Sequence, residues 1–546
     1  MRELFQRSDG SREVTRAYSR ARRALVAGVA LVLTPVALMA VGAFAQTEDE
    51  TDPARNTPLP CELVDTPGMP ARSAKNMTHL ANRCGLVGTD IEFQSRKDAS
   101  GKVHNFAFVG TMGAGFRIWD VTNPSNPRRA GGFVDSGWQN DIQVEGNVAV
   151  STFDGVAGED STASTCLKTK YPEANGQGVD IFKLHFDRST AEFDVTNPTC
   201  VANPPGGAHN ATLHPQGKWL AISNPSSDWA VDIIDLRPFF NGNGDPRHVY
   251  RFIDESRQDT QSEKDMKCPA DASFECVVMK RPDGSSASEL WRPHDVSFSR
   301  NGETMYVAAI NSTWIVNVSR VLEGRMPAIS IIPNQDSEPG ETSNDIAISH
   351  QADVSSDGKI LVVSDEKGGG TSNTSCNTET EGQQVIGALH FYALAPLGGV
   401  NRSNGASPSN PKKLGIYVNP NPTFAADPLD GVGTLPRLER GCTVHVFRLG
   451  GNGTAGPGPI DPNFDGVSRL GSRSLTTAWY GAGTWQMNFA GKPSNRDGIR
   501  EDDQTTWGNT KGWIAMPGAD TWSAKEYKGH IYTGDMLRGF DVFKIE

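Results

Sequence analysis

Short segments in which apolar and polar residues alternate recur along most of the chain, separated by glycine-containing turns. Each unit consists of an alternating strand, a turn, a β-rich strand, a second turn, and a strand that ends in Asp. The turns HPQGK, SRNGE and SSDGK place glycine where a short hairpin requires a positive φ. Seven such units follow residue 85, and the segments that define them are 103–127, 140–186, 208–236, 293–319, 349–394, 442–490 and 521–546.

These units predict an all-β fold, a β-propeller of seven four-stranded blades. One blade cannot bury its own faces, whereas radial stacking of several blades buries them and leaves little exposed edge. A parallel β-helix needs shorter and more uniform coils, and stacked sandwiches do not explain seven near-equivalent units. The last unit ends after a third strand at residue 546. We therefore expect the segment before residue 85 to supply the missing fourth strand.

The N-terminus has the order of regions that is typical of an export signal. Residues 1–23 contain seven arginines, residues 24–45 are uncharged, and the uncharged run ends in an A-x-A pattern. We interpret 1–45 as a signal peptide or an N-terminal membrane anchor, 46–60 as a flexible linker and 61–546 as the propeller. Arg22-Arg23 hints at twin-arginine export. The expected location is secreted or extracytoplasmic, with membrane contact only through 24–45 if this segment is not cleaved.

Composition and charge narrow the range of partners. The formal net charge is −12, and the N-terminal arm is basic, so the remainder is more acidic still. Phosphate binding needs a concentrated Lys/Arg surface, so we expect no nucleic-acid partner. An envelope protein or a small-molecule ligand is the expected partner. Insertions at 155–177, 256–290 and 400–441 favour recognition by loops.

Eight cysteines fit an oxidising compartment. An even number in an exported chain predicts disulfides, although 105 pairings of eight cysteines exist. We expect sequential pairing, because it closes loops or bridges single blades. The cysteines are Cys61, Cys84, Cys166, Cys200, Cys268, Cys276, Cys376 and Cys442.

The first unit resembles a known repeat family. GFRIWDVTNPSNPRRAGGF (115–133) is similar to the LVIVD-repeat consensus, and 475–489 with 529–545 resemble the C-terminal blades of bacterial LVIVD-repeat propellers. Units two to five depart from the consensus in the third strand, and the sixth departs further at 485–488. The resemblance implies a secreted or surface propeller and implies little about activity. A more distant likeness, at fold level, is to selenium-binding and methanethiol-oxidase propellers, whose metal sites use histidines near the channel.

Four histidines are the main candidates for chemistry. His209, His294, His350 and His445 each stand at the start of the first strand in units three to six. If these strands line the channel, the four side chains begin at the same end of it. Such a set would suit Zn²⁺, Cu or Fe. A repeated structural role and a metal-free substrate pocket are the alternatives.

The second strand of each unit runs back toward the face where the histidines are expected, and acidic residues stand near the ends of these strands. Asp365, Glu366 and Asp535 are candidates for a metal ligand, for a group that orients a histidine, or for a general base. A solvated loop charge is the alternative for each.

Two functional classes follow from these patterns. The first is a cell-envelope binding or scaffold propeller with a His-lined ligand or metal site at the channel mouth. The alternative is a metal-dependent enzyme, such as an oxidoreductase, that uses the channel histidines. The chain has no G-x-S-x-G, H-E-x-x-H or P-loop motif. The sequence therefore leaves the choice between binding and catalysis open.

Overall fold

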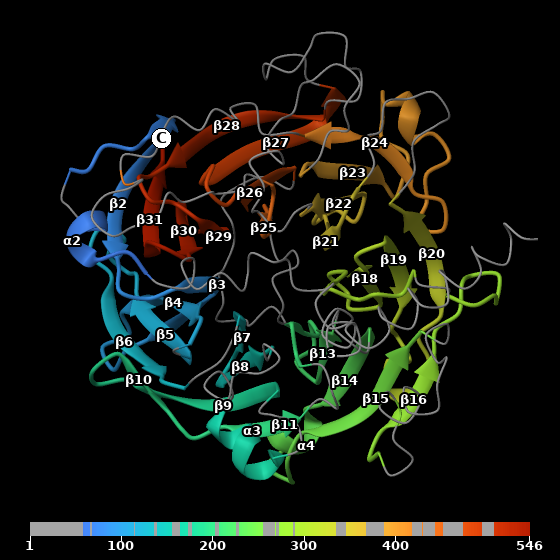
Figure 1. Cartoon of the computed structure of the whole chain (residues 1–546), viewed down its shortest axis with the longest axis horizontal. Helices are drawn as coiled ribbons and strands as arrows, with labels where there is room; N and C mark the ends of the chain where they lie inside the picture. The colour runs from blue at the N-terminus through green and yellow to red at the C-terminus, as the bar shows by residue number, and fades with distance from the viewer. Residues whose placement is uncertain are drawn as a thin grey trace, which may run out of the picture.

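The computed structural model is a closed ring of seven β-sheets around a central channel (Figure 1). The described residues are 58–546 except 66–67, 114, 136–138, 155–163, 173–176, 203–206, 225–228, 255–267, 269–271, 288–289, 335–345, 367–386, 418–428, 430–442, 451–472 and 494–506. The predicted seven-bladed propeller is thus confirmed. The signal or anchor segment and most of the linker lie outside the described residues.

The first three blades follow one another along the chain, each beginning with its innermost strand. Blade 1 comprises β3 (Gly88–Lys97), β4 (Val103–Thr111), β5 (Gly115–Asp120) and β6 (Arg128–Phe133). Blade 2 comprises β7 (Gln139–Glu145), β8 (Val148–Phe153), β9 (Gly178–Asp187) and β10 (Glu192–Val195), with β11 (Thr199–Ala202) also paired to β9. Blade 3 comprises β12 (Asn210–Leu213), β13 (Trp219–Asn224), β14 (Ala230–Asp235), β15 (Arg247–Ile253) and β16 (Glu275–Val278).

The remaining blades continue the same antiparallel order. Blade 4 comprises β17 (Asp295–Phe298), β18 (Thr304–Ala308), β19 (Ser312–Asn317) and β20 (Ala328–Pro333). Blade 5 comprises β21 (Ser349–Val354), β22 (Ile360–Asp365), β23 (Leu389–Ala393) and β24 (Lys412–Tyr417). Blade 6 comprises β25 (Phe447–Leu449), β26 (Ser474–Ala478), β27 (Thr484–Pro493) and β28 (Trp507–Ala515), and blade 7 begins with β29 (Thr521–Tyr527), β30 (His530–Asp535) and β31 (Gly539–Ile545).

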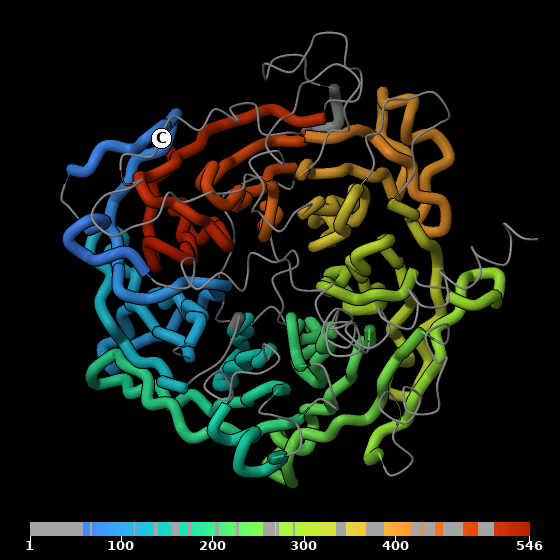
Figure 2. The backbone as a smooth tube through the Cα atoms, in the orientation of Figure 1, coloured from blue at the N-terminus to red at the C-terminus, as the bar shows by residue number. Residues whose placement is uncertain are grey.

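The N-terminal segment closes the ring, as the sequence predicts. β2 (Met77–Arg83) pairs antiparallel with β31 and completes blade 7, with Met77 opposite Ile545 and Arg83 opposite Phe540. β1 (Ser73–Lys75) pairs with β28 and adds an outer strand to blade 6. Figure 2 shows this N-terminal segment lying against the C-terminal end of the chain. The two ends of the described chain therefore hold each other in place.

Hydrophobic side chains fill the space between neighbouring blades. Phe106 and Phe108 of blade 1 pack in one cluster with Phe182 and Phe193 of blade 2. Trp291 and Trp314 meet edge to face, with ring centroids 5.1 Å apart, in a cluster shared by blades 3 and 4. Such contacts bury apolar surface on both faces of each sheet.

Helices are few and short in the described part of the chain. Among the described residues, no helix combines the length and the apolar character that crossing a membrane requires. The helices, 3-10 turns included, are α2 (Cys61–Val64), α3 (Thr165–Lys170), α4 (Arg237–Phe240), η3 (Val321–Glu323) and η5 (Asn401–Ser403).

Three disulfides follow the predicted sequential pairing. They join Cys61 to Cys84, Cys166 to Cys200, and Cys268 to Cys276. The other two cysteines, at 376 and 442, lie outside the described residues. Three disulfides in one chain are typical of an oxidising, extracytoplasmic compartment.

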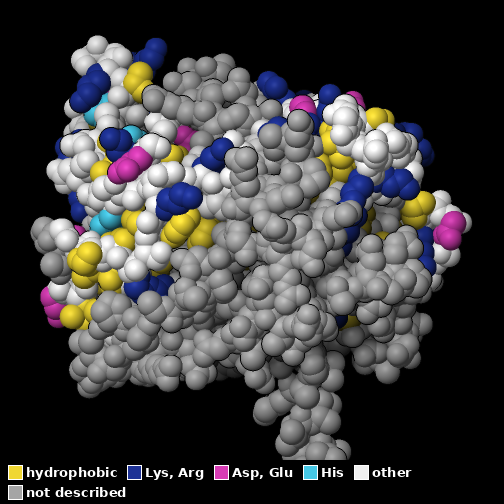
Figure 3. Space-filling model, turned by 90° about the horizontal axis from the view of Figure 1, so that it is seen from above, with side chains coloured by type: hydrophobic (Ala, Val, Ile, Leu, Met, Phe, Trp, Pro, Cys, Tyr) yellow, Lys and Arg dark blue, Asp and Glu magenta, His cyan; other side chains and the backbone are white. Residues whose placement is uncertain are grey.

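On the face seen in Figure 3, Lys and Arg side chains are dispersed rather than gathered in one patch.

Candidate functional site

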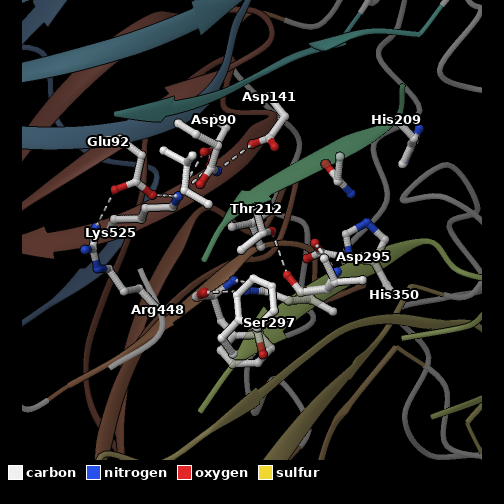
Figure 4. A pocket seen from close by; sticks show the side chains of 18 of the residues that line it. Asp90, Glu92, Asp141, His209, Thr212, Asp295, Ser297, His350, Arg448 and Lys525 are labelled. Carbon is white, nitrogen blue, oxygen red and sulfur yellow. Dashed lines mark hydrogen bonds and ion pairs between the residues drawn. The ribbon is translucent and has the colours of Figure 1, made fainter. Parts of the chain in front are cut away.

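The innermost strands enclose a polar cavity along the channel (Figure 4). Its empty space is about 1030 Å³, including the part that is open to solvent. Side chains from all seven blades line it, among them three of the four predicted histidines. Those that the argument below uses are Asp90, Glu92, Asp141, Gln143, His209, Asp295, His350, His445, Arg448, Trp522 and Lys525.

The four predicted histidines form one continuous row across blades 3 to 6. Ring centroids are 4.3 Å apart from His209 to His294, from His294 to His350, and from His350 to His445. All four side chains are buried. His209 and His294 directly precede an innermost strand, His350 is the second residue of β21, and His445 precedes β25 by two residues. The same position in successive blades therefore brings residues that are far apart in the sequence into contact.

Backbone carbonyl groups fix the proton positions of two rings. Nδ1 of His294 lies 3.0 Å from the carbonyl oxygen of His350, and Nδ1 of His445 lies 2.6 Å from that of Trp522. A carbonyl can only accept, so each Nδ1 must donate a proton. Burial and the neighbouring His209 lower the pKa of His294 well below its ordinary value, so its ring is neutral at pH 7. A neutral ring that donates from Nδ1 presents a lone pair at Nε2.

A carboxylate fixes the third ring in the same way. Nδ1 of His209 lies 2.7 Å from Oδ2 of Asp154, and both side chains are buried. Nε2 of His209 lies 2.8 Å from Nε2 of His294. If both rings are neutral, two lone pairs face each other at this distance. A proton shared by the two Nε2 atoms, or a metal ion bound by both, would make this short distance favourable.

Glu366 adds a carboxylate to the row. It directly follows β22, and its Oε2 lies 3.3 Å from Nε2 of His350, while Oε1 lies 3.5 Å from Nε2 of His445. One ligand atom from each of His294, His350 and Glu366 lies within 4.8 Å of the other two. In tetrahedral zinc the ligand atoms are roughly 3.3 Å apart, given Zn–N distances near 2.0–2.1 Å. These three groups could therefore converge on one metal ion after small movements.

Tyr480 holds Glu366 in position. Its hydroxyl donates a hydrogen bond to Oε1 of Glu366. The backbone of Tyr480 has a φ of 40°, an unfavourable value for a residue with a side chain, and its carbonyl accepts from the amide of Thr521. Strained backbone of this kind clusters at functional sites.

The other two acidic candidates bind backbone groups. Asp365 accepts hydrogen bonds from the amides of Ala347, Ile348 and Gly387. Asp535 accepts from the amides at positions 520, 537 and 538 and from one threonine hydroxyl. Burial, together with neighbouring carboxylates, raises the pKa of Asp535 to about 7. These contacts give both residues a role in holding connecting segments in place.

Sequence reasoning missed Asp154 and the role of Trp522. Asp154 directly follows β8, just as Glu366 directly follows β22. The second strands end at the same face of the propeller, so this shared position was the available signal. The carbonyl of Trp522 could not be found in this way, because every residue carries a carbonyl group.

A second group of metal-binding residue types lies in blade 2, where Cys166, Asp180 and Cys200 are close together. The two sulfur atoms are joined in a disulfide, so neither can serve as a thiolate ligand. This group is therefore structural.

Comparison with known proteins finds only a distant likeness in fold and no family. No family model and no curated protein matches the chain, so the resemblance to LVIVD-repeat propellers stays a prediction. The Cps50 (Swd1) β-propeller domain of Myceliophteria thermophila is similar in fold, with 9% identity, a TM-score of 0.44, and coverage of 86% of this chain and 100% of that one. The periplasmic gluconolactonase PpgL of Pseudomonas aeruginosa has 10% identity, a TM-score of 0.41, and coverage of 82% and 97%.

A putative 6-phosphogluconolactonase from Bacteroides uniformis is also similar in fold, with 12% identity, a TM-score of 0.39, and coverage of 78% of this chain and 85% of that one. At these TM-scores none of the three structures carries an argument about what this chain does. The chain is a seven-bladed β-propeller with disulfides and a buried His-His-Glu group.

Proposed function

We propose that this protein is an extracytoplasmic binding propeller that holds a transition-metal ion at the histidine row and presents it to a ligand in the channel. The observation that carries the proposal is the set of Nδ1 contacts. Each of His209, His294 and His445 donates from Nδ1 to a carboxylate or carbonyl oxygen and turns Nε2 toward the row. Metal-binding histidines almost always donate their other ring N–H to such an acceptor.

The ligand set suits a borderline metal. Imidazole nitrogens with one carboxylate favour Zn²⁺, Cu or Fe over Ca²⁺ or Mg²⁺, which prefer oxygen ligands. We assign His294, His350 and Glu366 as the central ligands, with His209 available at 2.8 Å from His294. Nε2 of His445 lies 3.5 Å from the second oxygen of Glu366, at the edge of this ligand set.

The position of the row supports a binding role. Of the assigned ligands His350 lines the cavity, as do the neighbouring His209 and His445, so a metal ion at the row would adjoin a small molecule in the channel. The second candidate function, a metal-dependent enzyme, is favoured by the same opening, because a catalytic metal needs a free coordination position. The candidate partners are a small molecule in the channel and a cell-envelope protein. The LVIVD resemblance agrees with placement at the cell surface or outside the cell.

Elemental mass spectrometry on the purified, oxidised protein tests the proposal. We expect one equivalent of Zn, Cu or Fe per chain, and loss of at least 90% of it in His294→Ala and in Glu366→Gln. His185→Ala, at an exposed position on β9, is the matched control and should keep the metal. Circular dichroism and thermal unfolding verify that each variant is folded. A wild-type protein that stays free of metal after incubation with each of the three metals would overturn the proposal.

A further inference from the structure

A second polar group lies on the channel wall, and its cations are already neutralised. Nζ of Lys525 is 2.7 Å from Oδ1 of Asp90 and 2.8 Å from Oε1 of Glu92. Nη1 of Arg448 is 3.4 Å from Oε2 of Glu92. Figure 4 shows these four side chains gathered on one side of the cavity, with Asp141 beside them. Both cations in this cluster therefore have carboxylate partners.

Asp141 and Asp295 contribute two further carboxyl groups to the cavity. Oδ2 of Asp141 accepts from the amide of Ala211 at 2.8 Å, and Oδ1 of Asp295 accepts from the amide of Val296 at 2.7 Å. Among the described residues, neither has a Lys or Arg within 4.0 Å. Burial, and the nearby charge of Asp90, raise the pKa of Asp141 well above its usual value. The two groups thus form an acidic arc from blade 2 to blade 4 without a direct cationic partner, and the charge of Lys525 acts on both only from a distance.

Gln143 supplies an independent sign of a missing donor. Its side chain is 4% exposed, and Nε2 donates to Oδ1 of Asp141 at 3.4 Å. Its amide oxygen is buried and has no hydrogen-bond partner. Because Gln143 lines the cavity, a ligand there could donate to this oxygen. Leaving a buried acceptor unsatisfied is unfavourable, so a donor bound there would be stabilised.

The chemistry of these groups suits an ammonium donor. Within the described part of the chain, neither Asp141 nor Asp295 belongs to a set of three His, Cys, Asp or Glu residues whose ligand atoms all lie within 4.8 Å of one another. A primary ammonium has three N–H donors that point in different directions. With N···O distances near 2.9 Å, its acceptors stand roughly 4.7 Å apart. One such group can therefore satisfy several carboxyl and amide oxygens at once.

We propose that the channel cavity binds a small molecule through a primary ammonium group, which donates to Asp141, Asp295 and Gln143. The site adjoins the histidine row, because Asp295 directly follows His294. None of the three groups is assigned to the metal, so the inference stands whether or not the row holds one.

Calorimetric titration of the purified full chain with n-butylammonium chloride tests the inference. n-Butanol has the same chain without the charge, and tetramethylammonium has the charge without N–H donors. We expect butylammonium to bind at least tenfold more tightly than either control. Asp141→Asn and Gln143→Met should each weaken its binding at least tenfold. Asp353→Asn is the matched control, because Asp353 is a buried acid on innermost strand β21 that does not line the cavity, and it should bind as the wild type does.

Each outcome decides for or against the ammonium site. Undetectable binding of butylammonium, or equal binding of butanol, would overturn the inference. Equal binding of tetramethylammonium would overturn the hydrogen-bonded arrangement. Unchanged binding in both folded variants would place the amine elsewhere and refute the site. His294→Ala should lose the metal and keep the amine, which separates this test from that of the metal site.

Discussion

Replacing Asp541 by Asn should strongly destabilise the closure of the ring, because this carboxylate neutralises a buried arginine. Arg538 is 0% exposed, and its Nε and Nη2 donate to the two oxygens of Asp541 at 2.8 and 2.9 Å. Asn82 and His79 of β2 also contact Oδ1 of Asp541, at 2.8 Å each. The pair therefore connects the last hairpin of blade 7 to the N-terminal strand that completes this blade.

The expected loss is large because the arginine cannot reach water. Asn keeps one acceptor but removes the charge and directs an amide N–H toward the guanidinium. Removing one partner of a buried ion pair costs about 3–5 kcal/mol of unfolding free energy. Although burial by itself raises the pKa of Asp541, the charge of Arg538 and the contact with His79 outweigh it and hold the pKa below its usual range. The stabilisation is therefore complete above pH 4 and is lost as the pH falls below that.

Guanidinium unfolding followed by tryptophan fluorescence measures the effect. At pH 7 we expect a lower midpoint that corresponds to about 3–5 kcal/mol, with a smaller difference from the wild type at pH 3. Asp187→Asn, an exposed carboxylate at the end of β9, is the matched control and should change stability by less than about 0.5 kcal/mol. A loss below about 1 kcal/mol in Asp541→Asn at pH 7 would refute the reasoning.

Three further changes test other parts of the fold. Burial raises the pKa of Asp180 to about 7, so the folded state holds an extra proton between pH 4 and 7 and loses stability as the pH rises through this window. Asp180→Asn should remove this pH dependence and raise the free energy of unfolding at pH 8 by about 4 kcal/mol, measured by urea unfolding. An unchanged pH dependence would contradict the assignment. Replacing both Cys61 and Cys84 by Ala should cost about 2–5 kcal/mol, measured by the shift in Tm, and an unaltered Tm would show that the bond is dispensable. A methyl group at Gly534 would lie 1.8 Å from the carbonyl oxygen of Thr89, so Gly534→Ala should cost about 3 kcal/mol or more in chemical unfolding, whereas wild-type stability would mean that blades 7 and 1 can separate freely.

Most of the fold could be predicted because its determinants are local. The segments VHNFAFVGT (103–111) and GFRIWD (115–120) coincide with β4 and β5, because period-2 patterning and glycine turns act within one hairpin. β16 was not predicted, because it lies in a long insertion and pairs parallel to β15 through contacts that no local pattern specifies. The pairing of β1 with β28 is non-local for the same reason.

The site was predictable in part. A histidine at the same position of four successive units was visible in the sequence, and the radial symmetry of a propeller brings such positions together. Two of the acceptors that set the tautomers were not visible, because they are backbone carbonyl groups. The third, Asp154, was missed although it follows β8 just as Glu366 follows β22. The acidic arc was also missed. In the segments NDIQV and HDVSF, Asp141 and Asp295 alternate with apolar residues and are typical of a solvent-facing side of a strand.

The architecture separates stability from binding. Hydrophobic clusters lie between blades, as with Phe106 and Phe182, whereas the polar groups discussed here lie at the innermost edge of each sheet. Burying carboxyl groups and imidazoles there costs free energy that the clusters between blades must offset. A bound cation would recover part of this cost, because it places a positive charge beside Asp141 or beside the lone pairs of the histidine row. The folded protein should therefore gain stability from a metal ion or an amine and tolerate Asp141→Asn.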